Sequence, residues 1–489
     1  MQHRPGAGAP HPRRQPPAAV RRTDDVAQAS LDAWHVLSRT WDIWWTRRGG
    51  FDTVAARAAE RTAALVAHAR RHSPFYRDAW RSLASPTPAL TSLPPVTKRE
   101  LMGRFDDWVT DRRLHRRGVE AFLTDRSHIG ERYLDRYVIW KSSGSTGEPG
   151  IFVQDAEALA VYDALIGVQL QTPALAGRYA LGFVTHGGRA ALVAATGDHF
   201  ASIASWQRMC RGSPWPTARA FSVMDPLPAL VDALNDYQPA FLASYPTTLV
   251  MLANEQRAGR LRIAPACIWS GGECLAPSAA STIEQAFASV LINEYGASEC
   301  MSIAYSCPAG WLHVNADWVV LEPVDRHYQA TPAGESSHSV LVTNLANRVQ
   351  PIIRYDLGDS ILVKPDPCGC GSPLPALRAE GRRDDVLMLR AQDGAIVPLS
   401  PLALTTVIED AIAGQRFQLV QTAPDRIAVR LGNADPDERV AEFGATKRAL
   451  DAYLSHQALD NVQLALDAGP PVPDPRSGKL REVIASVHA

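Results

Sequence analysis

Long apolar runs are absent, since no uninterrupted stretch of the 489 residues approaches the roughly 20 that a membrane helix requires. Charge imbalance is absent too. The net charge of −1 argues against a basic surface for nucleic acid or anionic membrane, so we expect neither partner. No apolar segment follows the N-terminal arginines, which excludes a typical signal peptide and leaves a transit peptide as the weaker alternative. Seven cysteines, an odd number, favour a reducing compartment over a disulfide framework, and we expect a cytoplasmic protein.

The chain is too long for one ordinary hydrophobic core, so two or more domains are expected. Residues 1–22 are rich in Pro, Arg, Gly and Ala, and we predict a disordered tail. Residues 25–71 have helical periodicity, and the helix should end at Ser73-Pro74 because proline disfavours helix in the residue before it. Thr97 and Glu100 have the spacing of a capping box at the start of another helix.

The middle of the chain alternates short apolar segments with helical ones. YALGFVTHGG, PAFLASYP, PACIWSGGE and SVLINEYGASE each resemble a strand that ends in a loop, and LPALVDALND and PTTLVMLANEQRAG are helical. This alternation predicts an α/β domain with a largely parallel sheet, whose ligands bind at the carboxyl ends of strands. Residues 337–365 instead predict two or three strands of a small barrel or mixed sheet. GRRDD (381–385) predicts a linker before a smaller α+β unit.

The segment WKSSGSTGEPGIF places hydroxyl groups and glycines between two apolar stretches. Such a loop can direct successive backbone N–H groups at phosphate oxygens, although an ordinary turn has the same composition. It lacks the GxxxxGK[ST] pattern and is therefore not a Walker P-loop. The candidate phosphate-binding residues are Ser142, Ser143, Gly144, Ser145, Thr146 and Gly147.

From about His68 onward the chain resembles the adenylate-forming ligases, and within them the phenylacetate–CoA ligase family. HARRHSPFYRDAW, LPPVTKRELM, SSGSTGEP, YGASE, RYDLGD, GRRDD and RSGKLRE occur in that family's order. Gly150 stands where many adenylating enzymes carry lysine, and the phenylacetate ligases also lack that lysine. The resemblance implies a large N-terminal AMP-binding domain with mixed parallel sheets and a β-rich subdomain (23–381), followed by a small mobile α+β lid (382–489).

The resemblance implies a reaction in which ATP activates a carboxylic acid as an acyl adenylate, pyrophosphate leaves, and the acyl group passes to CoA. Tyr295 would lie against adenine, Asp359 would accept hydrogen bonds from the ribose, and Ser298 would contact the α-phosphate. Glu299 would hold Mg²⁺, which prefers oxygen ligands. The remaining implied nucleotide-binding residues are Gly272, Glu273, Gly296 and Arg382.

The resemblance makes Lys479 the mobile lysine that bridges the carboxylate and the α-phosphate during adenylation, and Asp384 the hinge. Asp356 is expected to stabilise the local turn.

Two cysteine-containing segments suggest a structural Zn²⁺ site. Cys307 and His313 stand in CPAGWLH, and Cys368 and Cys370 in CGC. Three cysteines and one histidine suit tetrahedral zinc. The resemblance also implies such a site, because some members of that family carry a structural zinc at matching positions. The alternative is four unrelated residues. The other cysteines (Cys210, Cys267, Cys274 and Cys300) are interpreted as ordinary buried thiols.

The sequence says less about which carboxylic acid is activated and which acceptor receives the acyl group. Aromatic residues near the implied substrate pocket favour an aryl acid, namely Phe183, Trp206, Tyr245 and Trp269. Ala391 stands where the family has a glycine that helps to line the CoA tunnel. An amine, another small nucleophile or a carrier-protein thiol is therefore an alternative acceptor, and a degenerate nucleotide-binding protein is a third hypothesis. The sequence does not distinguish a monomer from a homodimer.

Overall fold

The computed structural model describes residues 18–489 except 84, 86–87, 143–148, 171–176, 178–186, 213–216, 383–384, 400, 413–414, 474–479 and 486–489. Two helices, α1 (Ala18–Arg48) and α2 (Phe51–His72), replace the single helix expected over 25–71. They separate at Gly50, whose φ of 82° a side chain would disfavour. α2 ends at Ser73 as predicted. Because α1 begins at Ala18, residues 18–22 are helical and not part of a disordered tail; residues 1–17 lie outside the described residues.

Short helices lead from α2 to the first sheet: α3 (Pro74–Ala79), η1 (Leu90–Ser92), α4 (Lys98–Gly103), α5 (Phe105–Trp108), α6 (Arg116–Leu123) and η2 (Arg126–His128). The predicted capping box is confirmed at α4, where the Thr97 side chain accepts from the Glu100 N–H and the Glu100 side chain accepts from the Thr97 N–H. The first sheet is antiparallel and contains β1 (Arg132–Tyr133), β2 (Tyr137–Lys141) and β3 (Ile151–Gln154). The Ser/Gly segment therefore connects β2 to β3.

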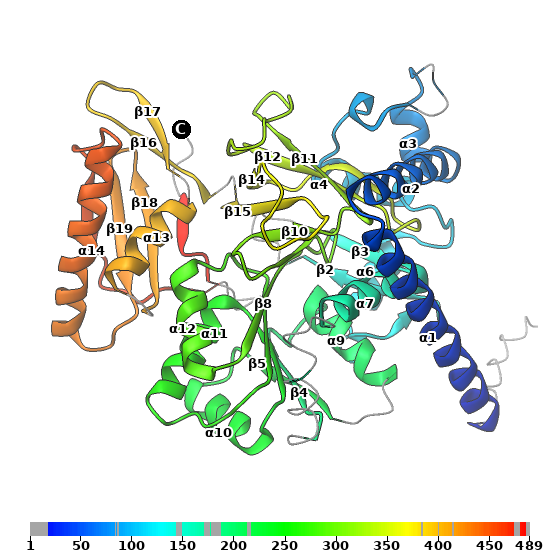
Figure 1. Cartoon of the computed structure of the whole chain (residues 1–489), viewed down its shortest axis with the longest axis horizontal. Helices are drawn as coiled ribbons and strands as arrows, with labels where there is room; N and C mark the ends of the chain where they lie inside the picture. Colours follow the sequence, from blue (N-terminus) through cyan, green and yellow to red (C-terminus); the bar gives the residue numbers. More distant parts are fainter. Residues whose placement is uncertain are drawn as a thin grey trace, which may run out of the picture.

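A nine-stranded sheet forms the centre of the large domain (Figure 1), in the order β14-β15-β10-β9-β8-β7-β6-β4-β5. The strands from β5 to β8 are parallel and the rest are antiparallel, which confirms the predicted mixed α/β architecture. The bounds are β4 (Ala190–Ala194), β5 (Ala218–Ser222), β6 (Phe241–Ser244), β7 (Cys267–Gly271), β8 (Val290–Tyr295), β9 (Ala304–Ser306), β10 (Leu312–Val314), β14 (Asp359–Val363) and β15 (Ala376–Arg382).

The helices of this domain are α7 (Ala156–Leu170), α9 (Ala201–Gly212), α10 (Leu227–Tyr237), α11 (Pro246–Arg257) and α12 (Pro277–Phe287). Both helices predicted from sequence are confirmed as α10 and α11, and three of the four predicted strands as β6, β7 and β8. The fourth predicted strand, YALGFVTHGG, lies largely outside the described residues.

The β-rich region contains an antiparallel three-stranded sheet of β11 (Val319–Val324), β12 (Ser339–Asn344) and β13 (Ile352–Asp356). The strands predicted in residues 337–365 are confirmed as β12, β13 and β14, but they do not form one small barrel or sheet. After β13 the chain turns at Gly358, which has a φ of 77°, and β14 pairs with β15 in the central sheet instead of closing the small one.

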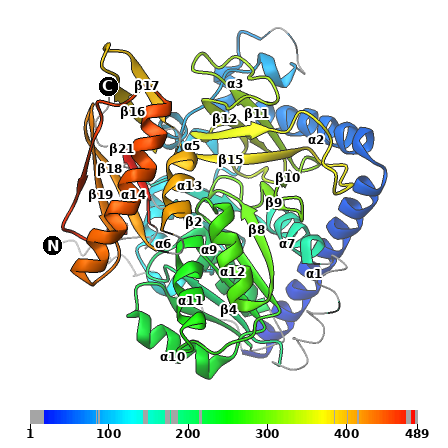
Figure 2. The same cartoon turned by 60° about the vertical axis from the view of Figure 1, so that its left-hand side comes forward.

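The C-terminal unit has a hydrophobic core of its own, built from residues between Leu387 and Val483. Its strands are β16 (Leu387–Arg390), β17 (Ile396–Leu399), β18 (Phe417–Ala423), β19 (Arg426–Leu431), β20 (Gln463–Leu466) and β21 (Val483–Ala485), and its helices are α13 (Pro401–Ala411) and α14 (Pro436–His456). This is the predicted small α+β unit, and it stands to one side of the large domain with α13 next to α12 (Figure 2).

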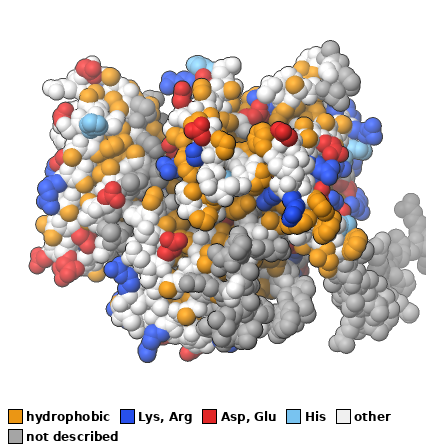
Figure 3. Space-filling model, in the orientation of Figure 1, with side chains coloured by type: hydrophobic (Ala, Val, Ile, Leu, Met, Phe, Trp, Pro, Cys, Tyr) orange, Lys and Arg blue, Asp and Glu red, His pale blue; other side chains and the backbone are white. Residues whose placement is uncertain are grey.

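The surface of α1 carries unusually large exposed hydrophobic side chains, namely Trp34, Leu37, Trp41, Trp44 and Trp45. The rings of Trp41, Trp44 and Trp45 pack on one another with centroids 5.0 to 5.7 Å apart. Hydrophobic side chains gather on the visible face beside this helix (Figure 3). Among the described residues, no helix has the length and apolar character that crossing a membrane requires.

Candidate active site

One cavity of about 870 Å³ lies at the carboxyl ends of the parallel strands, bounded by α9 on one side and by β13 to β15 on the other. The predicted site residues that line it are Ser142, Gly272, Glu273, Tyr295, Gly296, Ser298, Glu299, Asp359 and Arg382. Residues 143–147, Asp384 and Lys479 lie outside the described residues. Every described residue that was predicted to bind the nucleotide therefore borders the same space, although they come from five separate segments of sequence.

Tyr295, Asp359 and Arg382 form a polar chain along one wall of this cavity. The Tyr295 hydroxyl donates to Asp359 Oδ2 at 2.8 Å, and Arg382 Nη1 lies 3.5 Å from Asp359 Oδ1. Burial raises the pKa of the Asp359 carboxyl, and the Arg382 guanidinium and the Tyr295 hydroxyl counteract that shift. A carboxylate has about four acceptor positions, so Asp359 can accept further hydrogen bonds from a ligand.

Glu299 is held rigidly although it faces the cavity. Its side chain is 8% exposed, its Oε1 accepts from the Tyr355 hydroxyl at 2.8 Å, and its carbonyl accepts from Asn344 at 3.0 Å. The Ser298 carbonyl accepts from the Trp140 indole at 2.8 Å. These contacts fix the backbone of the YGASE loop.

Close packing requires a glycine at position 296 of the same loop. A Cβ on Gly296 would lie 2.0 Å from the Met301 carbonyl oxygen, so any side chain would displace the backbone. The neighbouring motif RYDLGD behaves as predicted at Asp356, whose Oδ1 accepts from the Gly358 N–H at 3.2 Å within the turn.

Glu273 joins the cavity to the C-terminal unit. Its Oε2 accepts from the Thr247 N–H at 3.1 Å and from the Thr247 hydroxyl at 2.8 Å. Its Oε1 accepts from the backbone N–H of Leu480 at 3.2 Å. The residue that follows Lys479 in sequence is therefore bound at the rim of the cavity.

The two described ends of the Ser/Gly segment are bonded to each other. The Gly150 N–H donates to Ser142 Oγ at 2.8 Å, and the Ser142 N–H donates to the Gly150 carbonyl at 2.9 Å. A Cβ on Gly150 would lie 2.7 Å from the buried Phe152 ring, which explains why this position is glycine.

The same Cβ would lie 3.4 Å from Lys98 Cδ, and Lys98 lines the cavity from the first turn of α4. Sequence reasoning missed Lys98, since nothing in LPPVTKRELM distinguishes it from a solvated lysine.

The other end of the cavity is apolar and aromatic. Trp206, Tyr245 and Trp269 line it as expected, together with Phe241, whereas Phe183 lies outside the described residues. Sequence reasoning also missed Glu294, which lines this end from the second-last position of β8. Glu294 follows the polar Asn293 in β8, so no local pattern of the sequence distinguished it.

The four predicted zinc ligands are close together in space. Their ligand atoms all lie within 4.8 Å of one another, with Cys307 and Cys368 Sγ 3.8 Å apart and His313 Nε2 3.1 Å from Cys370 Sγ. His313 Nδ1 is 2.9 Å from the Leu374 carbonyl. The prediction for the remaining thiols was wrong for Cys274, which is exposed, and for Cys210, which is half-buried; Cys267 and Cys300 are buried.

Ala391 lies in the small unit, at the end of β16 furthest from the linker. It is buried, its N–H donates to the Ala395 carbonyl at 2.8 Å, and it begins the β16–β17 turn. Beside the linker, Asp385 pairs with Arg481.

No family model matches the sequence, and neither does any of the curated proteins. Solved structures do match. A 2-hydroxyisobutyryl-CoA ligase in the postadenylation state with 2-HIB-AMP is 20% identical, with 89% of both chains covered and a TM-score of 0.62. The same ligase in an open conformation with 2-HIB-AMP and CoA gives 20% identity, 89% and 91% coverage and a TM-score of 0.52.

An anthranilate–CoA ligase in complex with anthranoyl-AMP is 15% identical over 70% of this chain and 65% of its own, and its TM-score of 0.46 is too low to carry an argument. At these identities the likeness shows the fold. The chain therefore has the fold of an adenylate-forming acyl-CoA ligase, as its ordered motifs implied.

Proposed function

We propose that this protein is an ATP-dependent ligase that converts a carboxylic acid to an acyl adenylate with release of pyrophosphate and then transfers the acyl group to CoA. One observation carries the proposal. Motif residues from Ser142 to Arg382 line a single cavity at the carboxyl ends of parallel strands, where ligands bind in such sheets. The 2-hydroxyisobutyryl-CoA ligase with the same fold was captured with an acyl adenylate and with CoA, which supports both halves of the reaction.

The nucleotide would lie along the polar wall. We propose that Tyr295 packs against adenine, that Asp359 accepts from the ribose hydroxyls beside Arg382, and that Ser298 contacts the α-phosphate. Gly272, Glu273 and Gly296 would complete the nucleotide site, because glycine backbone allows close approach to a ligand. The Ser/Gly loop from Ser142 to Gly147 would hold the terminal phosphates.

Phosphate charge must be neutralised for this chemistry. Glu299 offers a buried carboxylate held by Tyr355, which fits the oxygen ligands that Mg²⁺ prefers; the ion would supply charge neutralisation at the phosphates. Lys98 would add a cation beside the Ser/Gly loop at a place where Gly150 leaves room. Lys479 would bridge the carboxylate and the α-phosphate, with Asp384 as the hinge of a mobile lid that begins at residue 382.

We propose that the four-residue cluster of Cys307, His313, Cys368 and Cys370 holds a structural Zn²⁺ ion. Tetrahedral zinc with Zn–S distances of about 2.3 Å places two sulfur ligands about 3.8 Å apart, and Cys307 and Cys368 match this separation. The Leu374 carbonyl beside His313 Nδ1 favours the tautomer that leaves Nε2 free to bind metal. All four positions would be filled by protein, so the ion would have no catalytic role.

CoA is the proposed acceptor, and the alternatives are an amine, another small nucleophile or a carrier-protein thiol. Ala391 is the reason for considering these alternative acceptors, because its methyl group stands where a tunnel-lining glycine is expected. The aromatic wall of Trp206, Phe241 and Trp269 favours an aryl acid. We also propose a cytoplasmic location from the cysteine content.

Two linked measurements test the function. Pyrophosphate release from ATP is measured with a panel of aryl and alkyl acids, and acyl-CoA formation is followed by mass spectrometry in the same reactions. Acid-dependent pyrophosphate release together with acyl-CoA is expected. Pyrophosphate without acyl-CoA would replace CoA by another acceptor, and no pyrophosphate with any acid would contradict the adenylation itself.

A further inference from the structure

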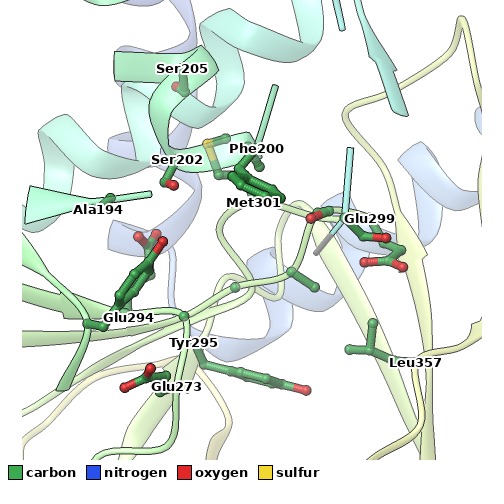
Figure 4. Close-up of a pocket in the computed structure, with 18 of the residues that line it drawn as sticks. Ala194, Phe200, Ser202, Ser205, Glu273, Glu294, Tyr295, Glu299, Met301 and Leu357 are labelled. Atoms are coloured by element: carbon green, nitrogen blue, oxygen red, sulfur yellow. The ribbon is translucent and has the colours of Figure 1, made fainter. Parts of the chain in front are cut away.

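The cavity contains a carboxyl group that the adenylation chemistry does not use. Glu294 and Tyr295 are consecutive in β8, so their side chains leave opposite faces of the strand. The Tyr295 hydroxyl reaches Asp359 on the nucleotide side. Glu294 lies instead at the end of the cavity where Ser202, Ser205 and Phe200 stand, away from Glu299 (Figure 4).

Only part of the Glu294 carboxyl is satisfied by the protein. The Trp269 indole N–H donates to Oε2 at 2.9 Å. Oε1 is buried and accepts no hydrogen bond within ordinary distance and angle limits. Burial raises the pKa of Glu294 to about 7, while the neighbouring Ser302 hydroxyl and the Trp269 indole act to lower it. No lysine, arginine or histidine of the described chain forms an ion pair with Glu294.

The surroundings of this carboxyl are otherwise those of a pocket for an apolar ligand. The Trp206 and Phe241 rings are stacked with centroids 6.5 Å apart, and the Phe241 and Trp269 centroids are 6.2 Å apart. Leu192 and Met209 add apolar surface, and the α9 hydroxyls of Ser202 and Ser205 line the facing wall. A buried acceptor that lacks a partner in such a setting is costly, and a ligand that donates to it removes that cost.

We propose that Glu294 selects carboxylic acids bearing a hydrogen-bond donor, either a hydroxyl or an amino group, on the end remote from the reacting carboxylate. The assignment rests on the proposed adenylation, because that reaction places the substrate carboxylate on the Glu299 side of β8 and the remote end beside Glu294. Sites built to hydrogen-bond a substrate group discriminate strongly against analogues without it, since a buried partner is then left unpaired.

A matched acid series tests the proposal. Benzoic and phenylacetic acids carrying H, OH, NH₂ or OCH₃ at the same ring position are compared by kcat/KM for pyrophosphate release. The hydroxy and amino acids should exceed the unsubstituted and methoxy acids by roughly 10- to 100-fold, as expected for one buried hydrogen bond. The methoxy acid controls for size without a donor, and the hydroxy and amino acids distinguish the two donor types.

Two variants of Glu294 sharpen the test. Glu294→Leu removes the acceptor and should abolish the preference for donor-bearing acids. Glu294→Gln keeps an acceptor for Trp269 and adds a donor, so it should reduce the preference and improve the methoxy acid. Glu284→Gln on α12, an exposed position outside the cavity, should change nothing. Thermal melting checks that each variant folds.

The outcomes separate this proposal from the proposed function. If no acid releases pyrophosphate, adenylation is wrong, and binding of the same acids by calorimetry then decides whether donors are preferred. If the wild-type enzyme uses unsubstituted acids as well as hydroxy or amino acids, the proposal is overturned whatever the variants do. A preference that survives in a folded Glu294→Leu variant overturns it as well.

Discussion

Asp359 is the residue on which nucleotide recognition should depend most directly. Asp359→Asn preserves the shape and can still accept from Tyr295, but it removes the charge that strengthens hydrogen bonds from the ribose. Hydrogen bonds to charged groups contribute about 1.5–3 kcal/mol, so KM for ATP should rise roughly 10- to 100-fold in steady-state assays. Asp366→Asn, an exposed change in the same β-rich region, is the matched control. An unchanged KM in Asp359→Asn would exclude the ribose role.

Glu294 should also make stability depend on pH. Its pKa is about 7 in the folded protein and 4.5 ordinarily, so the folded state retains a proton that the unfolded chain releases. Stability is therefore lost as the pH rises from about 4.5 to about 7 and is constant above, and the loss is on the order of 3 kcal/mol.

Glu294→Gln lacks this titration. Its unfolding midpoint, measured by calorimetry, should exceed that of the wild type by an amount that grows through the same pH window. Parallel curves for the two proteins from pH 4.5 to 8 would contradict the raised pKa.

At the residue scale, sequence reasoning found the groups that sit in ordered motifs and missed those defined only by tertiary neighbours. Glu299 and Asp359 could be proposed from sequence because YGASE and RYDLGD carry them, and both line the cavity. Lys98 and Glu294 could not, because their significance lies in the Gly150 gap and in burial against Trp269, which no local pattern encodes. The prediction that Cys274 is buried was wrong for the same reason, since the exposure of a side chain depends on the fold.

The short helix α4 illustrates how one element can position a residue with a proposed function. Thr97 and Glu100 form the capping box, and Lys98 is the first residue inside it. Thr97→Ala removes the side-chain acceptor and should lower the free energy of unfolding by about 1 kcal/mol. Because the same turn places Lys98, KM for ATP should increase too. Thr97→Ser, which keeps the hydroxyl, should restore both; failure of Ser to restore them would separate the effect from capping.

The proposed zinc ion should cross-link two segments of the β-rich region. Cys307 and His313 flank the β9–β10 connection, whereas Cys368 and Cys370 belong to the segment between β14 and β15. Cys370→Ser should lower the bound zinc, measured by elemental analysis, from about one equivalent to well below it, and should reduce the melting temperature by roughly 5–10 °C. Cys274→Ser is the control outside the cluster. Wild-type protein purified without added zinc that holds well under one equivalent would refute the site.

Helices and strands could be predicted where the local sequence determines where they begin and end. The capping box at Thr97 and the stop at Ser73-Pro74 are encoded locally, and α10 and α11 follow from periodicity. The break at Gly50 was missed although the Gly49-Gly50 pair is a local turn signal. The partner of β14 was also missed, since strand pairing is a long-range choice that periodicity does not specify.

At the scale of the whole molecule, the proposed active site involves two units that have separate cores. One contact between them is the hydrogen bond from the Leu480 backbone of the C-terminal unit to Glu273 of the large domain. The proposed nucleotide-binding residues lie in the large domain, apart from Arg382, which ends β15 at the start of the linker. The two units should therefore divide their tasks, with ATP held by one and the reaction completed by the other.

Lys479→Ala tests this division of tasks. ATP binding, measured by calorimetry, should stay within about threefold of the wild type because the large-domain wall is intact. Pyrophosphate release should fall by roughly 10²- to 10³-fold, the typical cost of removing one group that stabilises transition-state charge. Transfer from a chemically prepared acyl adenylate to CoA should persist, because Lys479 acts only in the first half-reaction. Lys447→Ala is the control, because this partly exposed lysine of α14 pairs with Asp451 outside the cavity. Normal adenylation by Lys479→Ala would show that the C-terminal unit does not supply the proposed lysine, whereas loss of ATP binding would show that the two units bind the nucleotide together.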